Sequence, residues 1–366
     1  MPKRKTTKAE DGLSPVDQIS AYLETNKADH YNFEEERSYV VSSGSLLLDI
    51  EMGGGIGPGV IRASGITEGG KTSCALAFAK NFQKMDNAMV VYIKSEGRLS
   101  AEMIERAGVS TDENKWFIYK SNVYESVINL MRELVANNPS QRKYMFIIDS
   151  MDSLVPKNDL EKPPEEANKV AGGALLSSDF LRKMALGMTT RGHICYMVSQ
   201  VRSKVSINPY EKTDARVTNA SGGNALLHYS DWILEFQERH LKDIISTQPN
   251  GKGDLLGHWC KVVFKKTPNE KTGSLVRYPI RYGRVGGKSI WVEYEVVDYL
   301  IAFDMAKKAG AWVTISDDLM SEVEEKTGEE FKKQHQGTDN LRKYFEENPK
   351  IGKYIFNKFR ETLKKS

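Results

Sequence analysis

The sequence has few of the features that mark disulfide-rich, metal-bound or membrane-embedded proteins. Its 366 residues contain three cysteines, at 74, 195 and 260, which form no CxxC pair and have no histidine nearby at metal-ligand spacing. Its uninterrupted apolar stretches, such as 88–93 and 145–148, are far shorter than the ~20 residues that a membrane-spanning helix needs. We therefore expect no transmembrane segment, and we expect each cysteine to be a small buried hydrophobic residue rather than a ligand or nucleophile.

A strong charge of one sign is also missing. The formal net charge of +3 is too small to indicate a nucleic-acid partner by itself, so any such inference depends on where the charge lies. Lys3, Arg4, Lys5 and Lys8 make the N-terminus basic, but no apolar signal-peptide core follows them. This pattern argues against secretion and makes the cytoplasm the expected location.

What the chain does contain is an alternation of apolar, strand-like runs with helix-length segments. From about residue 40 to residue 281 this alternation is typical of an α/β domain with a mostly parallel central sheet. The last three predicted strands follow one another without a long helix, which predicts an antiparallel or mixed extension at one edge. The predicted strands are Val60–Ser64, Met89–Lys94, Trp116–Tyr119, Tyr144–Ile148, His193–Ser199, Trp232–Phe236, Trp259–Lys266 and Leu275–Arg281.

The N-terminal residues 1–39 differ from this central part. Ser14 and Pro15 have the pattern of an N-cap and a first helical residue. We therefore expect a basic segment with one short helix, whose apolar stripe packs either on its own domain or on a neighbouring subunit. The stripe consists of Val16, Ile19 and Leu23.

A helix-rich pattern after residue 287 predicts a second, small α/β domain over residues 288–366. In its last segment apolar residues recur every four positions, and lysines and arginines occupy the other side. Residues 350–366 contain six lysines and arginines against Glu361 alone. This basic side is either a solvated helix face or a DNA contact. The apolar positions are Ile351, Ile355, Phe359 and Leu363.

A glycine-rich segment fits the phosphate-binding pattern G-x-x-x-x-G-K-[ST]. It follows the predicted strand Val60–Ser64 and opens a helical segment, Ser73–Asn81, which is the context that the motif requires. Its backbone N–H groups and the helix dipole favour phosphate. Lys71 is expected to reach the β- and γ-phosphates of ATP, and the Thr72 hydroxyl to bind Mg²⁺. The predicted nucleotide-binding residues here are Gly65, Ile66, Thr67, Glu68, Gly69, Gly70, Lys71, Thr72 and Ser73.

Two acidic residues follow other predicted strands. Asp149 comes directly after Tyr144–Ile148, and Glu96 follows Met89–Lys94. The carboxyl ends of parallel strands face the ligand crevice, so Asp149 is placed to hold Mg²⁺ through water. Glu96 is placed to orient, or take a proton from, the water that attacks the γ-phosphate. Read alone, Asp149 is an ordinary turn residue and Glu96 an ordinary surface glutamate near a helix start.

Further motifs resemble those of one known family, in the same order along the chain. The chain resembles the RecA-type homologous recombinases from residue 40 to about residue 365, a span that a generic ATPase core would not produce. The motifs are VSSGSLLLDI at 41–50, IIDS at 147–150, SQVR at 199–202, GGNAL at 222–226 and KAGAW at 308–312.

The resemblance implies an ATP-dependent recombinase with a RecA-like ATPase core at 40–287. Such proteins form helical filaments on single-stranded DNA and pair it with a homologous duplex in recombination and repair. The resemblance gives Glu96 the role of catalytic glutamate, and Gln200 that of a sensor of the γ-phosphate. It implies that Lys266 reaches the neighbouring subunit's ATP and that Tyr282 lies near the nucleotide base.

The resemblance also implies two DNA-binding loops in the core, at residues 157–171 and 201–221. The second loop has a net charge of about +2, which suits contact with phosphates, whereas the first has about −1 and is not a basic patch. The alternative for both is a flexible surface loop without a ligand. The expected DNA-binding residues are Arg202, Lys204, Arg216, Gly222, Gly223 and Asn224.

The chain departs from bacterial RecA at several positions. Ser100 and Met103 stand where the bacterial family has an aspartate and a tyrosine against adenine, and Phe264 replaces one of two lysines at the subunit interface. The acidic C-terminal tail is replaced by a basic one. These differences suggest a divergent branch, such as a bacteriophage recombinase.

Two other functions compete with a recombinase. One is a regulatory paralogue that assembles on nucleotide but barely hydrolyses it, and Glu96 with an intact phosphate loop argues against that role. The other is a ring-shaped DNA motor, against which the family-like C-terminal segment argues. A recombinase of this kind implies a single-strand-binding protein and a loader as further partners, and no membrane partner.

Overall fold

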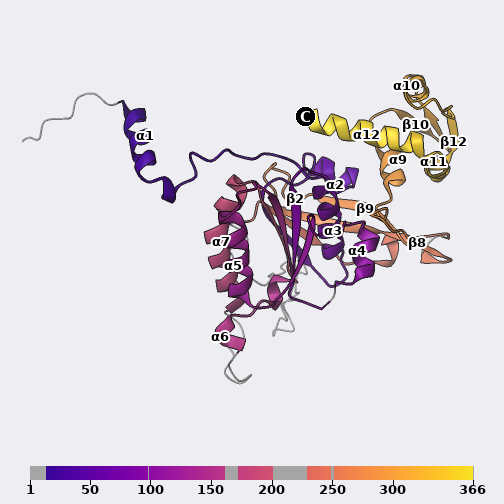
Figure 1. The fold of residues 1–366 in the computed structure, drawn as a ribbon. Coiled ribbons are helices and arrows are strands. Elements are labelled where there is room, and N and C mark those ends of the chain that lie inside the picture. The colour runs from indigo at the N-terminus through magenta and orange to yellow at the C-terminus, as the bar shows by residue number, and fades with distance from the viewer. Residues whose placement is uncertain (1–13, 98, 161–171, 201–228, 249–250, 366) are drawn as a thin grey trace, which may run out of the picture.

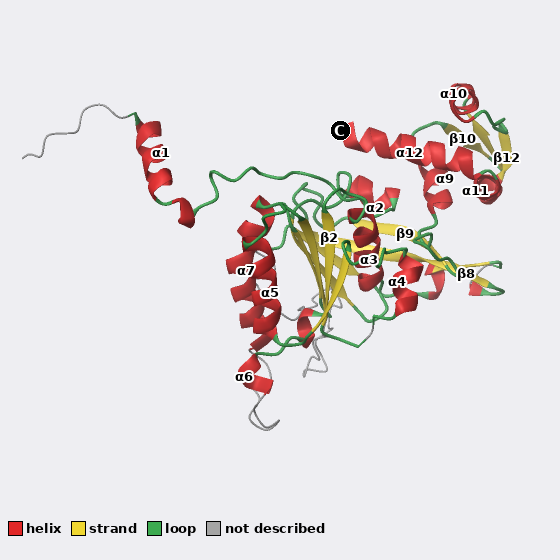
Figure 2. Cartoon of the chain, in the orientation of Figure 1, coloured by secondary structure: helices red, strands yellow, loops and turns green. Residues whose placement is uncertain are grey.

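A computed structural model of the chain describes residues 14–97, 99–160, 172–200, 229–248 and 251–365. These residues form a large α/β unit, a helix that precedes it, and a smaller C-terminal α/β unit (Figures 1 and 2). None of the helices in this part of the chain is both long and apolar enough to traverse a bilayer.

Nine strands of the described residues form one sheet, in the order β3-β2-β4-β5-β1-β6-β8-β7, with β9 paired to β8. The strands from β3 to β6 in this order run parallel, whereas β8 is antiparallel to β6, β7 and β9. The prediction of a mostly parallel sheet with an antiparallel extension is therefore confirmed. The strands are β1 (Gly59–Gly65), β2 (Ala88–Lys94), β3 (Trp116–Lys120), β4 (Lys143–Asp149), β5 (Ile194–Val198), β6 (Trp232–Phe236), β7 (Ile244–Ser246), β8 (Leu255–Lys266) and β9 (Leu275–Arg281).

Each predicted strand is present, with differences at the ends. β8 begins at Leu255, four residues before the predicted start, because its first residues pair with β7 and β9. The three-residue β7 was not predicted, since so short a run has no recognisable alternation.

Helices cover both faces of the parallel strands (Figure 1). Along β4, Met145 and Ile147 pack with α3 and α4, whereas Phe146 and Ile148 pack with α5 and α7. The three cysteines are all buried and free, which confirms that they are core residues. The helices of this unit are α2 (Leu46–Glu51), α3 (Lys71–Phe82), α4 (Ala101–Ala107), α5 (Tyr124–Ala136), α6 (Lys157–Leu160) and α7 (Gly172–Thr190).

The N-terminal helix α1 (Pro15–Thr25) lies apart from the sheet (Figure 1). Ser14 caps it and Pro15 is its first residue, as predicted. The side chains of Val16 and Ile19 are 69% and 59% exposed, so the stripe does not pack on the core of its own chain. Of the two expectations for this stripe, packing on a neighbouring subunit stays a prediction.

The C-terminal unit has its own hydrophobic cluster. Ile351, Ile355 and Phe359 are buried in it, which confirms the apolar side predicted for the last helix. It contacts the larger unit through α2, α9 and β9. Its elements are α9 (Val292–Ala302), β10 (Ala306–Ala309), β11 (Trp312–Ile315), α10 (Asp317–Thr327), β12 (Gln334–Gln336), α11 (Gly337–Glu347) and α12 (Pro349–Lys365).

Candidate nucleotide-binding and catalytic site

The glycine-rich segment connects β1 to α3 at the carboxyl edge of the parallel strands. β1 lies between β5 and β6, so the segment emerges from the middle of the sheet. Gly65 has φ +137°, and a Cβ at this position would lie 2.3 Å from the Phe236 carbonyl oxygen. Gly70 has φ +109° and caps α3. These two glycines are therefore required by the backbone path, whatever the loop binds.

Lys71 and Thr72 form the first residues of α3, two residues earlier than the predicted helix start. The buried Lys71 ammonium donates to the carbonyl oxygens of Gly65 at 3.0 Å and Ile66 at 2.5 Å, so the side chain folds back over its own loop. The Thr72 hydroxyl donates to Asp149 Oδ2 at 2.8 Å. The two residues that the sequence assigned to Mg²⁺ therefore lie in direct contact.

Asp149 is fixed by a second donor. The Tyr92 hydroxyl, on the neighbouring strand β2, donates to Asp149 Oδ2 at 2.6 Å. Burial raises the pKa of Tyr92 above its ordinary range, and the nearby Asp149 carboxylate raises it further. Tyr92 therefore remains a hydrogen-bond donor across the physiological pH range.

Glu96 lies beside Asp149 because β2 and β4 are paired in parallel, with Lys94 opposite Asp149. The backbone N–H of Glu96 donates to the Asp149 carbonyl oxygen at 3.3 Å. Its carboxylate oxygen Oε1 accepts from the Ser150 hydroxyl and, at 2.7 Å, from the Ser153 hydroxyl. Two hydroxyl donors thus fix the position of the carboxylate.

Gln200 follows β5 and reaches the same crevice. Its backbone N–H donates to Asp152 Oδ2 at 2.5 Å. Beneath it, Arg62 Nε donates to the Ser199 hydroxyl at 3.0 Å. Burial lowers the pKa of Arg62 to about 10, against the opposing effects of Asp152 and Glu235. The backbone of Gln200 is therefore held beside a polar network formed by Asp152, Arg62 and Ser199.

Side chains from the glycine-rich segment and from the ends of β2, β4 and β5 line one cavity of about 410 Å³. The structure thus brings together residues that the sequence assigned to four separate segments. Of the predicted set, the cavity is lined by Thr67, Glu68, Gly70, Lys71, Thr72, Ser73, Glu96, Asp149 and Gln200.

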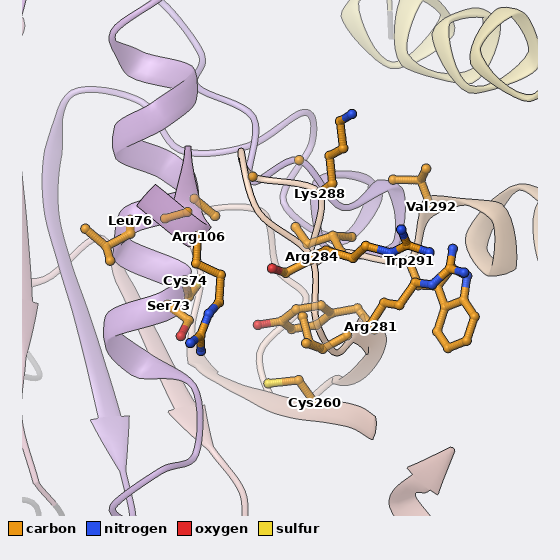
Figure 3. A pocket seen from close by; sticks show the side chains of 18 of the residues that line it. Ser73, Cys74, Leu76, Arg106, Cys260, Arg281, Arg284, Lys288, Trp291 and Val292 are labelled. Atoms are coloured by element: carbon orange, nitrogen blue, oxygen red, sulfur yellow. The ribbon is translucent and has the colours of Figure 1, made fainter. Parts of the chain in front are cut away.

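Tyr282 lines a second, larger cavity of about 1180 Å³, which adjoins the first at Glu68, Gly70, Ser73 and Met103. The Tyr282 hydroxyl accepts from Arg239 at 3.1 Å, and its ring lies 5.4 Å from that of His258. Burial lowers the pKa of His258 to about 4. Figure 3 shows this cavity, with Ser73, Cys74 and Arg106 on one side and Arg281, Arg284 and Lys288 on the other.

The two departures at the expected base position have local structural roles. The Ser100 hydroxyl accepts from the Met103 backbone N–H at 3.2 Å and caps α4. Met103 is partly buried against the core. Ser100 is therefore engaged by its own helix.

Lys266, in contrast, lies away from this crevice. It pairs with Ile233 in β6, which is level with Arg62 in β1. Its charge acts on Asp231, whose Oδ2 accepts from the Val60 backbone N–H near the start of β1. Phe264 is fully buried against Trp232, so the residue that replaces an interface lysine is a core residue here.

The predicted DNA-binding loops are outside the described residues for the most part. Within the first loop, Lys157–Leu160 forms the short helix α6 rather than a loop. Pro156 precedes it, and the Pro156 carbonyl accepts from the backbone of Asp159 and Leu160. Residues 161–171 are not described, and neither are the predicted contacts Arg202, Lys204, Arg216, Gly222, Gly223 and Asn224.

Sequence reasoning missed the residues that position the carboxylates. Tyr92, Asp152 and Ser153 were not predicted, and Ser150 was noted only as the neighbour of Asp149. The available signal was the cluster of serine and aspartate at 149–153 directly after a buried strand, at the edge where parallel strands bind ligands.

Comparisons with known proteins point to one family. The RecA N-terminal domain model matches residues 29–270. The chain is 27% identical over 328 residues to Protein RecA of Rickettsia bellii, covering 89% of this chain and 84% of that protein. It is 27% identical over 332 residues to Protein RecA of Halalkalibacterium halodurans, again covering 89% and 84%.

Proposed function

Because this chain belongs to the RecA family, we propose that it is a DNA-dependent ATPase that forms filaments on single-stranded DNA. The ATP-bound filament pairs this strand with a homologous duplex and exchanges strands, in recombination and repair. The observation that most supports ATP hydrolysis is the arrangement of Lys71, the Thr72–Asp149 pair and Glu96 around one cavity.

Three residues of the cavity have proposed roles in ATP binding and hydrolysis. Lys71 leaves its loop carbonyls to bind the β- and γ-phosphates of ATP. Glu96, held by the two serine hydroxyls, orients the attacking water and accepts its proton. Gln200 senses the γ-phosphate and transmits its presence to the segment that begins at residue 201.

The pair Thr72 and Asp149 fits a magnesium ion. A hydroxyl and a carboxylate are hard oxygen donors, and Mg²⁺ binds few protein ligands while it keeps several waters. When bound, the ion would neutralise charge on the phosphates. The chain contributes the fixed position of Asp149, which Tyr92 and Thr72 hold from two sides.

The remaining assignments follow the family. Lys266 acts on the ATP of a neighbouring subunit, and Tyr282 contacts the base. The proposed layout is an oligomerisation helix within 1–39, an ATPase core at 40–287 with both DNA-binding loops, and a small domain at 288–366. The protein works in the cytoplasm, with a single-strand-binding protein and a loader as partners.

One experiment tests the proposal. ATP turnover is measured with and without single-stranded DNA, the same samples are imaged for filaments, and joint molecules with a homologous duplex are assayed. We expect DNA-stimulated turnover, filaments and homology-dependent joints. Closed rings, or assembly without turnover, would contradict the proposal and favour a ring motor or a regulatory paralogue.

A further inference from the structure

The larger cavity carries a group of cations that the proposed ATP chemistry does not use. Lys80 and Lys84 belong to the C-terminal end of α3 and the turn after it, Lys288 to the segment before α9, and Arg360 to α12. All four line the cavity, at the junction between the large unit and the C-terminal unit. Four positive side chains from three parts of the chain therefore share one recess.

This group lies too far along α3 to serve the phosphates of a nucleotide bound at Lys71. Lys80 comes nine residues after Lys71, which corresponds to about 14 Å along a helix axis. Lys84 lies beyond the end of the helix, farther still from the phosphate loop. A triphosphate held by the glycine-rich segment would leave these cations unneutralised.

No direct salt bridge within the described residues neutralises Lys80, Lys84, Lys288 or Arg360 either, although Arg360 lies close enough to the buried Asp49 for its charge to act on that carboxyl. Two of the acidic residues that line the cavity pair with other cations: Glu102 with Arg106, and Glu346 with Arg281 and Arg342. Glu68, Glu293 and Glu347 also line it, but the lining residues include more lysines and arginines than carboxylates. The pKa of Lys80 is lowered by burial and by its neighbours Lys84 and Lys288, and that of Lys84 by burial and by Arg360. The cations thus repel one another.

Hydrogen bonds fix the backbone around these cations. Lys80 Nζ donates to the carbonyl oxygens of Gly286 and Gly287, at 3.3 and 3.0 Å. The N–H groups of these glycines donate in turn to the last residues of α4. A Cβ on Gly287 would lie 2.2 Å from Lys80 Nζ, so the segment before α9 is packed closely on α3. Lys288 is therefore held near Lys80 by a fixed framework.

We propose that this junction is a second anion site, which binds linked phosphate groups and ties the C-terminal unit to the ATPase core. Lysine ammonium groups and the arginine guanidinium both bind phosphate, and several cations spread over a large recess need more than one anionic group. A bound oligophosphate would remove the repulsion between α3, the segment before α9, and α12. This inference is independent of the DNA-pairing activity proposed above.

The test is calorimetric titration with inorganic tripolyphosphate in excess Mg²⁺. We expect one binding event that Lys71→Ala abolishes and a second that Lys84→Ala/Lys288→Ala weakens about tenfold or more, since two exposed charges are removed. Lys84→Arg/Lys288→Arg should restore the second event. Lys115→Ala/Lys353→Ala removes the same charge from exposed positions outside the cavity and should leave both events unchanged.

Two further probes identify the ligand. A dT tetranucleotide that competes for the second event would assign the site to the phosphodiester backbone, and tripolyphosphate binding without such competition would assign it to free polyphosphate. The proposal is overturned if no second event is seen, if Lys115→Ala/Lys353→Ala weakens it equally, or if hexaglutamate binds there more tightly than either phosphate probe.

Discussion

Lys266→Ala and Glu96→Gln should each abolish most DNA-stimulated ATP turnover alone and restore part of it when mixed. The reason is the position of Lys266 relative to its own phosphate loop. In the sheet, Lys266 lies opposite Ile233 of β6, which lies opposite Arg62 of β1. Because Arg62 precedes Gly65 by three residues and β8 is two strands from β1, the backbone of Lys266 lies about 14 Å from that of Gly65. Its charge acts on Asp231, toward the opposite edge of the sheet. Any contribution of Lys266 to hydrolysis must therefore come from a neighbouring copy.

The expected magnitudes follow from this geometry. Loss of a cation supplied in trans should slow turnover by about a thousandfold, while nucleotide binding by isolated subunits stays nearly unchanged. In a filament assembled from equal amounts of the two variants, about one interface in four pairs an intact Glu96 with an intact Lys266, because the contact is head-to-tail. Turnover should then recover to about a quarter of the wild-type value.

The assay is steady-state ATP hydrolysis at several mixing ratios, with two fluorophores to verify that the filaments are mixed. Lys265→Ala is the matched control, because Lys265 neighbours Lys266 but pairs with Glu235 within its own sheet. It should retain wild-type turnover. Absence of recovery in demonstrably mixed filaments would refute the shared-site assignment, and so would equal loss in Lys265→Ala.

Four further outcomes are expected. Lys71→Ala should lose ATP binding or its productive geometry, whereas Glu96→Gln should bind and assemble but hydrolyse ~100-fold more slowly; near-normal turnover would remove Glu96 from catalysis. Arg202→Ala should weaken single-stranded DNA binding for all sequences and reduce its salt dependence, and wild-type affinity at every salt concentration would show that Arg202 does not contact phosphate. GTP should support a larger share of the activity than the bacterial pattern would suggest, because Ser100 caps α4 and Met103 offers no aromatic face; a strong preference for ATP over GTP in competition would indicate that Tyr282 reads adenine. Burial raises the pKa of Glu295 from 4.5 to about 8, so the free energy of unfolding of the wild type, relative to Glu295→Gln, should fall as pH rises through this range, by at most about 1.4 kcal/mol per pH unit. If urea unfolding gives the same difference between the two proteins at pH 6 and at pH 8, Glu295 is an ordinary carboxyl.

The sequence by itself determined the parallel strands of the large sheet and the glycine-rich segment between β1 and α3. These are local or periodic signals: buried parallel strands are continuous apolar runs, and a phosphate loop requires glycines and a lysine at fixed spacing. The position of Asp149 and Glu96 after strands was sufficient to place both at one edge of the sheet, because parallel strands share one carboxyl edge. The resemblance to a known family then supplied roles for Gln200 and Lys266.

Only the tertiary structure decided which side chains hold these groups and which cations share a space. Ser150 and Ser153 bind Glu96 from more than fifty residues away, and hydrogen bonds between distant segments leave no periodic trace in a sequence. Lys80, Lys288 and Arg360 are dispersed along the chain and line one cavity only because α12 packs on α2 and α9, and the segment before α9 packs on α3. Charge patterning along one helix reports the charge of that face, whereas the field at a junction depends on how separate elements pack together.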